Sequence, residues 1–82
     1  MATISHSQRV AANVRAELAR RGIARSALAQ QLGLSTSALS RRLDCTVPLS
    51  IDEVWDAGAA IALLSGDEGF TPVSLVGEVV AA

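Results

Sequence analysis

With 82 residues and a formal net charge of −1, the chain has room for one small domain with a single modest core. Half of the residues are apolar and only Trp55 and Phe70 are aromatic, which favours closely packed helices and argues against a protein that stacks single-stranded bases on exposed rings. The lone Cys45 allows no disulfide within the chain, and the longest apolar stretch, residues 57–64, is too short to span a membrane. With no secretory signal visible, we expect a small all-α domain in the cytoplasm.

The charges are divided along the chain. All seven basic residues are arginines within residues 1–43, where Glu17 is the single acid, and the other seven acids lie from Asp44 onward. A phosphate backbone responds to the face it meets rather than to the net charge. The division therefore predicts a basic face for a polyanion and a solvated acidic face turned away from it.

The first predicted helix begins after Ser5, whose spacing to Gln8 is that of a capping box, and ends at Gly22, which tolerates the left-handed stop conformation. Apolar residues recur inside it at helical spacing and leave charged residues for the opposite face. These are Val10, Ala11, Val14 and Leu18 on one side, and Arg9, Glu17 and Arg20 on the other.

Two short helices are predicted next. The first covers about residues 24–32 and is stopped by Gly33; the second covers residues 36 to about 44 and is capped by Ser35. The inward positions of both helices are leucine or alanine: Leu28, Ala29, Leu32, Leu39 and Leu43.

Ser50 and Glu53 have the spacing of another capping box, which opens a fourth helix that ends at about Leu64. An apolar stripe follows at helical spacing and includes Ile51, Val54, Trp55, Gly58, Ile61 and Ala62. We expect Trp55 to lie in the core. Because glycine in a helix costs about 1 kcal/mol relative to alanine, Gly58 indicates close backbone packing.

The tail from Thr71 supports two alternatives. Thr71 and Pro72 are typical of the start of a fifth helix, whereas the valine-rich segment that follows favours an intersubunit strand. Any dimer is expected to form through the fourth helix or this tail, with packing over the chain's own core as the alternative. The candidate interface residues are Val73, Leu75, Val76, Val79 and Val80.

Residues 25–44 have the layout of a helix-turn-helix, with the small Ala29 where two helices cross and Gly33 where the turn needs positive φ. The chain resembles the Cro/repressor (XRE-type, lambda repressor-like) helix-turn-helix family of phage and bacterial regulators over about residues 7–64. The resemblance runs through Gly22-Ile23 and Leu28-Ala29-Gln30-Gln31-Leu32-Gly33-Leu34-Ser35-Thr36-Ser37-Ala38-Leu39-Ser40-Arg41, and into Pro48-Leu49-Ser50.

This resemblance implies a compact four- to five-helix DNA-binding domain in residues 1–66, followed by an apolar tail, residues 67–82, as a candidate oligomerisation element. It implies a sequence-specific regulator of transcription, a Cro-like protein or small repressor, that occupies an operator in double-stranded DNA. The third helix would enter the major groove. The implied base contacts are Thr36, Ser37, Ser40 and Arg41, and the implied backbone or mixed contacts are Arg25, Ser35 and Arg42.

Two positions depart from the family pattern. Ala24 stands where a polar N-cap is common, and Arg42 stands where the family has an apolar residue, which Leu43 could replace. Arg41 is the strongest candidate for reading sequence, because a guanidinium can pair with O6 and N7 of guanine.

A different class of function remains open, in which the acidic second half binds a protein, as in an antitoxin or anti-repressor. An enzyme is disfavoured. His6, Cys45 and Asp44 have no metal-ligand spacing, and the chain has no glycine-rich phosphate loop, so we expect neither a metal nor a cofactor.

Overall fold

The computed structural model of the chain describes residues 6–44 and 46–76. These residues form five helices and no strand, which confirms the all-α prediction. The helices are α1 (His6–Arg21), α2 (Arg25–Leu32), α3 (Thr36–Leu43), α4 (Ile51–Ser65) and α5 (Val73–Val76). Ser5 of the first predicted capping box, and Val79 and Val80 of the predicted interface, lie outside the described residues.

Local sequence signals fix where the middle helices begin and end. Gly33 ends α2 at φ +69°, and the amide of the next residue donates to the Ala29 carbonyl at 2.9 Å. The Ser35 hydroxyl accepts from the Ala38 amide at 3.0 Å at the start of α3. At the start of α4 both hydrogen bonds of the capping box between Ser50 and Glu53 are present. These predicted caps are confirmed.

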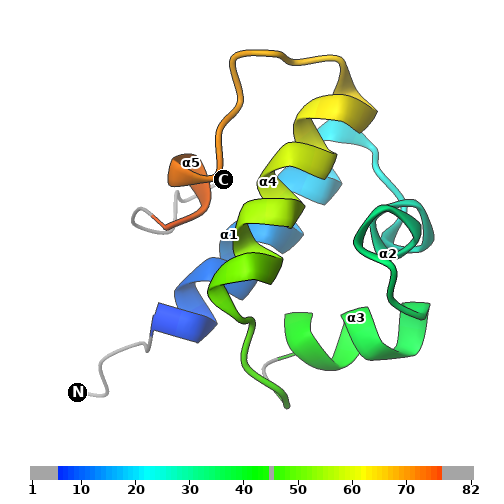
Figure 1. Cartoon of the computed structure of the whole chain (residues 1–82), viewed down its shortest axis with the longest axis vertical. Coiled ribbons are helices and arrows are strands. Elements are labelled where there is room, and N and C mark those ends of the chain that lie inside the picture. The colour runs from blue at the N-terminus through cyan, green and yellow to red at the C-terminus, as the bar shows by residue number, and fades with distance from the viewer. Residues whose placement is uncertain (1–5, 45, 77–82) are drawn as a thin grey trace.

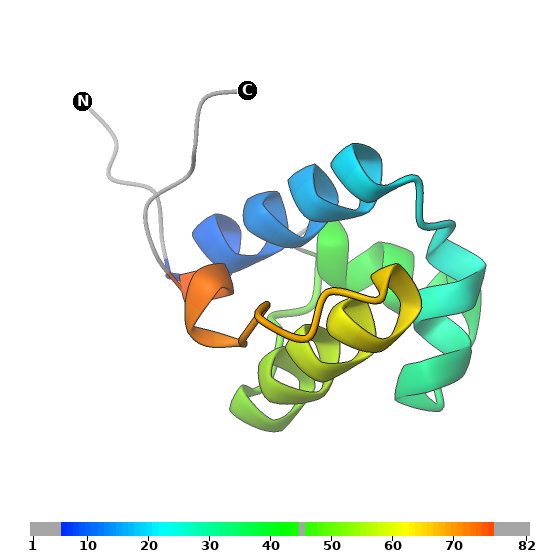
Figure 2. The same ribbon diagram turned by 90° about the horizontal axis from the view of Figure 1, so that it is seen from above.

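The core lies between α1 and α4, which run side by side in the same direction (Figures 1 and 2). The helices α2 and α3 pack against one side of this pair, and α5 lies against it on the side away from α2 (Figure 1). Every helix contributes to the core. The largest fully buried side chains are Leu28, Leu39, Leu43, Ile61, Leu75 and Val14.

The segment before α5 approaches α4 closely at Gly58. A Cβ atom on this glycine would lie 2.6 Å from the Cα of Pro72 and 2.7 Å from its Cγ, so no other residue fits without displacing backbone. This contact confirms the predicted close packing at Gly58.

Residues 73–76 are helical, as the Thr71–Pro72 signal predicted. Leu75 is buried in the chain's own core, and its carbonyl accepts from the buried Asn13 side chain at 2.8 Å. The prediction of Leu75 as an interface residue is therefore wrong, because this apolar side chain is already covered by α1 and α4. Val73 and Val76 remain exposed.

The apolar stripe of α4 is rotated from its predicted position. Val54, Ala57 and Ile61 form the buried face, whereas Trp55 is 54% exposed and Ile51 is 82% exposed. Each residue turns a helix by about 100°, so Trp55, which follows Val54 directly, falls outside the buried face. The prediction that Trp55 lies in the core is wrong.

Candidate nucleic-acid interface

The helix α3 has one buried and one exposed side. Leu39 and Leu43, four residues apart, are buried against the other helices. Thr36, Ser37 and Arg41 are exposed on α3, and the capping Ser35 is exposed just before it. Four of the residues assigned to DNA contact therefore lie together on a polar surface that begins at the first turn of α3.

Arg25 connects the start of α2 to the last turns of α3. One of its Nη atoms donates to the Ser40 hydroxyl at 3.3 Å and lies 3.8 Å from a carboxylate oxygen of Asp44. Ser40 is half-buried, unlike Thr36 and Arg41. The side chain of Arg25 is 38% exposed, so it supports α3 from within and also reaches solvent beside it.

Arg42 lies away from the exposed residues of α3. Its Nε donates to the Glu53 carboxylate at 2.6 Å, and one Nη donates to the Ala38 carbonyl at 3.0 Å. Both charged side chains are only 21% exposed. Because Glu53 also closes the capping box of α4, Arg42 joins the end of α3 to the start of α4.

This connection changes the acidity of Glu53. Partial burial opposes ionisation, but the Ser50 amide and the Arg42 guanidinium outweigh it, so the pKa of Glu53 lies below its ordinary value. The glutamate is therefore an anion at neutral pH, held between two donors from different elements.

One more contact that holds α3 was not predicted from the sequence. The Arg15 guanidinium, on α1, donates to the carbonyl of Leu43 at the end of α3. A cation at this end opposes the partial negative charge of the helix terminus. Arg15 itself is exposed, and the apolar pattern of α1 contains no signal for this contact.

The division of charge along the sequence does not separate the charges in space. Ion pairs join Arg25 to Asp44, Arg42 to Glu53 and Arg21 to Asp67. The prediction of a separate acidic outer face is wrong for these three acids, because folding places each beside an arginine. The Arg41 side chain makes no hydrogen bond or ion pair with any residue that the structure describes, and its charge remains open to solvent.

Glu17 also departs from its predicted place on the solvent face of α1. It is only 7% exposed, and its carboxylate lies 2.8 Å from Arg20 and 3.6 Å from Arg21. Arg21 in turn lies over the Phe70 ring, 4.6 Å from its centroid.

The same Arg21 holds the segment that follows α4. Its guanidinium donates to Ser65 and to Asp67, both at 3.0 Å. The hydrogen bond from Arg21 is the main reason that the pKa of Asp67 lies below its ordinary value. This cluster fixes the chain on its way from α4 to α5.

The described residues contain no group of three or more histidine, cysteine, aspartate or glutamate side chains placed to hold a metal. Within the same ranges, 6–44 and 46–76, no helix is both long and apolar enough to cross a bilayer.

Glu53→Gln is expected to lower stability in a pH-dependent way. Because the folded-state pKa of Glu53 lies below the unfolded value, its stabilisation is complete above about pH 4.5 and is lost as the pH falls through the lower folded value. Urea unfolding should therefore show a less stable variant at pH 7 and a smaller difference from wild type at pH 3. An equal difference at both pH values would show that the charge of Glu53 contributes nothing.

No family model, curated protein sequence or solved structure matches the chain.

Proposed function

We propose that this chain is a sequence-specific, double-stranded DNA-binding regulator of transcription, with α2 and α3 as a lambda repressor-like helix-turn-helix. It acts by occupying an operator and performs no chemistry. The observation that carries the proposal is the exposed polar surface of α3, where Arg41 has no hydrogen bond or ion pair with the described residues. A guanidinium without a partner among the described residues, on a helix held by several contacts, is suited to donate hydrogen bonds to base edges in a major groove.

The supports around α3 favour this function over a merely solvated helix. Arg15, Arg25 and Arg42 hold its second half through four contacts, to Leu43, Ser40, Asp44 and Glu53. Base reading depends on hydrogen-bond geometry. A rigidly held helix presents Thr36, Ser37 and Arg41 in a fixed arrangement, so less conformational entropy is lost when the protein binds DNA.

Arg25 is the proposed phosphate contact beside this surface. Its link to Asp44 is long, at 3.8 Å, and both side chains reach solvent. Such an exposed pair contributes little, about 0 to 1 kcal/mol, so a DNA phosphate can replace Asp44 as the anion beside Arg25. Arg42, with its shorter bond to Glu53, is proposed to position α3 and not to touch DNA.

A protein-binding function is the second candidate, because Ile51 and Trp55 are exposed and apolar. Co-purification of an untagged partner from the native host would favour an antitoxin or anti-repressor.

The function is tested by selection of bound sequences from a random pool of duplex DNA with the purified protein. Enrichment of a defined site supports the proposal, and it supplies the cognate duplex for all later measurements. Recovery of unenriched sequences at 150 mM salt, from protein shown to be folded by circular dichroism, would contradict it.

Arg25→Ala is expected to weaken binding to the selected site and to random DNA by similar factors. Since one phosphate contact is lost, the slope of log K against log salt should fall by about 1 unit. Titrations at several salt concentrations measure it. Arg20→Ala is the matched control, because Arg20 lies near the end of α1 and is paired with Glu17; its slope should equal that of wild type. An unchanged slope for Arg25→Ala would remove Arg25 from the phosphate contacts.

A further inference from the structure

The outer side of α4 is left uncovered by the other described helices. In Figure 1 α4 lies in front of α1, with its near side open. Apolar side chains follow each other along this side at intervals of four residues, so they form one continuous ridge on the helix surface. This α4 ridge consists of four exposed residues: Ile51, Trp55, Ala59 and Leu63.

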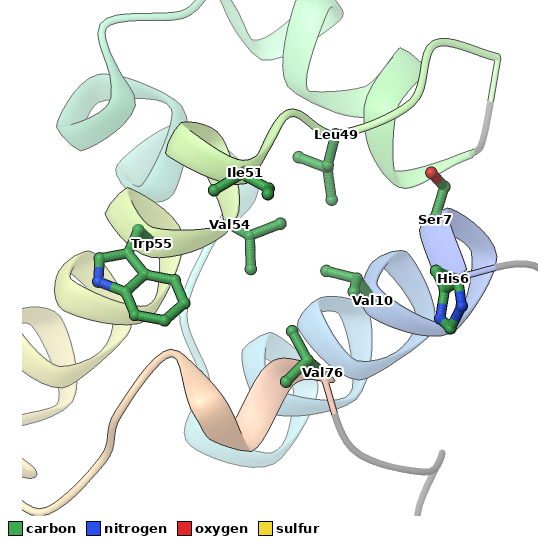
Figure 3. A pocket seen from close by; sticks show the side chains of 8 residues that line it. All are labelled: His6, Ser7, Val10, Leu49, Ile51, Val54, Trp55 and Val76. Atoms are coloured by element: carbon green, nitrogen blue, oxygen red, sulfur yellow. The ribbon is translucent and has the colours of Figure 1, made fainter.

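The surface along the α4 ridge is hollowed. One hollow lies at Trp55 and a second at Leu63, and Asp56 lines both of them. Trp55 and Ile51 also border an apolar groove between the starts of α1 and α4, as Figure 3 shows. An exposed tryptophan among apolar neighbours, with charges beside it, has the composition of an interface centre with a polar rim.

The acids beside the α4 ridge differ from most acids of the fold. Asp52 and Asp56, four residues apart, line the same hollow as Trp55. Neither forms an ion pair with the residues that the structure describes. Folding therefore leaves two anions next to the exposed ridge, whereas it pairs other acids with arginines. The paired acids are Glu17, Asp44, Glu53 and Asp67.

We propose that the α4 ridge is the docking site for a basic amphipathic helix of another protein. The apolar side chains of that helix pack against Trp55, and its lysines or arginines lie beside Asp52 and Asp56. A helix surface has no free backbone groups for strand pairing, but a ridge of this kind fits the groove between the side-chain rows of a second helix. From Ile51 to Leu63 the ridge is about 18 Å long, which about three turns of a partner helix cover.

The chain's own charges argue against a second copy as the occupant. A copy would need one helix that carries both cations and large apolar side chains on its surface. The last arginine is Arg42, and the chain has no lysine, whereas the large apolar side chains exposed on the described residues begin at Val47. The helices α1, α2 and α3 therefore offer cations without a large exposed apolar side chain, and α4 and α5 offer the reverse. The partner that fits is a different protein.

This inference does not rest on DNA binding, because the α4 ridge and the exposed residues of α3 belong to different helices. It gives the chemistry of a partner for the protein-binding surface at Ile51 and Trp55. Peptide binding is measured without DNA, so its failure and the failure of the DNA selection are separate results.

A library of displayed helical peptides, about five turns long and randomised on their surface, is selected against the purified full chain. We expect the enriched peptides to carry leucine, isoleucine or phenylalanine four residues apart, with lysine or arginine beside them. Enrichment of acidic or uncharged peptides would contradict the proposed partner.

The dissociation constant of the most enriched peptide locates the site. It is measured by the fluorescence anisotropy of a dye on the peptide. Trp55→Ala should raise this constant at least about thirtyfold, as expected for an interface hot spot. Val73→Ala, which truncates an exposed apolar side chain on α5, is the control and should leave it unchanged. Circular dichroism establishes that each variant is folded.

The charges are tested by replacing both free acids. Asp52→Asn with Asp56→Asn should weaken peptide binding about tenfold at low salt, and by a much smaller factor at about 1 M salt, because salt screens exposed charges. Glu68→Gln is the matched control. Glu68 is also exposed and makes no ion pair with the described residues, but it follows α4, so its replacement should not change the affinity.

Three further results would overturn the proposal. They are a folded protein that enriches no peptide, an affinity that Trp55→Ala or the double aspartate variant leaves unchanged, and a dimer of the free chain that Trp55→Ala dissociates in sedimentation equilibrium. The last would assign the α4 ridge to a second copy of the chain.

Discussion

Gly58→Ala lowers the free energy of unfolding by about 1 to 3 kcal/mol, although alanine is the better helix former. The added methyl group would lie 2.6 Å from the Cα of Pro72, and a backbone atom cannot rotate away as the end of a side chain can. Relief requires the segment before α5 to move from α4, which also strains the hydrogen bond between Asn13 and Leu75. Urea unfolding at pH 7 measures the change.

Gly69→Ala is the matched control for this substitution. A methyl group there meets only a carboxylate oxygen of Asp67, at 3.5 Å, which is ordinary contact. The stability of Gly69→Ala should therefore lie within about 0.5 kcal/mol of wild type. A gain in stability for Gly58→Ala, of the size that helix propensity alone gives, would show that the contact with Pro72 is absent in solution.

Arg41→Ala weakens binding to the selected DNA site about 5- to 150-fold, and changes binding to random duplex DNA by a much smaller factor. The range follows from the roughly 1 to 3 kcal/mol of discrimination that a bidentate arginine–guanine pair supplies. Because the Arg41 side chain has no hydrogen bond or ion pair with the described residues, the thermal stability of the free protein should not change. Equal losses on both DNAs would remove Arg41 from the reading of sequence.

The neighbouring Arg42→Ala provides the comparison. It removes two hydrogen bonds inside the chain, to Glu53 and Ala38, so the melting temperature should fall. At a temperature where the variant is fully folded, the ratio of specific to random binding should stay close to that of wild type. We therefore expect Arg41→Ala to lower the specificity of DNA binding and not the stability, and Arg42→Ala to lower the stability and not the specificity.

The parts of this fold that depend on near neighbours along the chain were predictable from the sequence. Gly33 ends α2 and Ser35 caps α3 because left-handed backbone and N-terminal amides impose requirements within a few residues. The close approach at Gly58 was also predictable, since an interior glycine in a helix needs a reason.

Features that depend on the directions of packed helices were not predictable in this way. Trp55 belongs to an apolar run, but the rotation of α4 is set by what Val54 and Ile61 pack against. Glu17 is paired with Arg20 and Arg21, and Arg21 is held in turn by Asp67 and Phe70 from a distant part of the chain. The same limit applies to the candidate site. The polar face of α3 follows from the positions of Leu39 and Leu43, whereas the partners of Arg25 and Arg42 come from other helices.

The hydrogen bond from Asn13 to Leu75 spans 62 positions and joins α1 to α5. During synthesis α1 leaves the ribosome long before the residue that supplies this carbonyl acceptor, and the ribosomal tunnel delays that residue further. Until residue 75 has left the tunnel, the native core also lacks the buried Leu75 side chain. The fold therefore cannot be completed before Leu75 is free to pack against α1, and a nascent chain stalled before α5 presents an open apolar surface to chaperones and proteases.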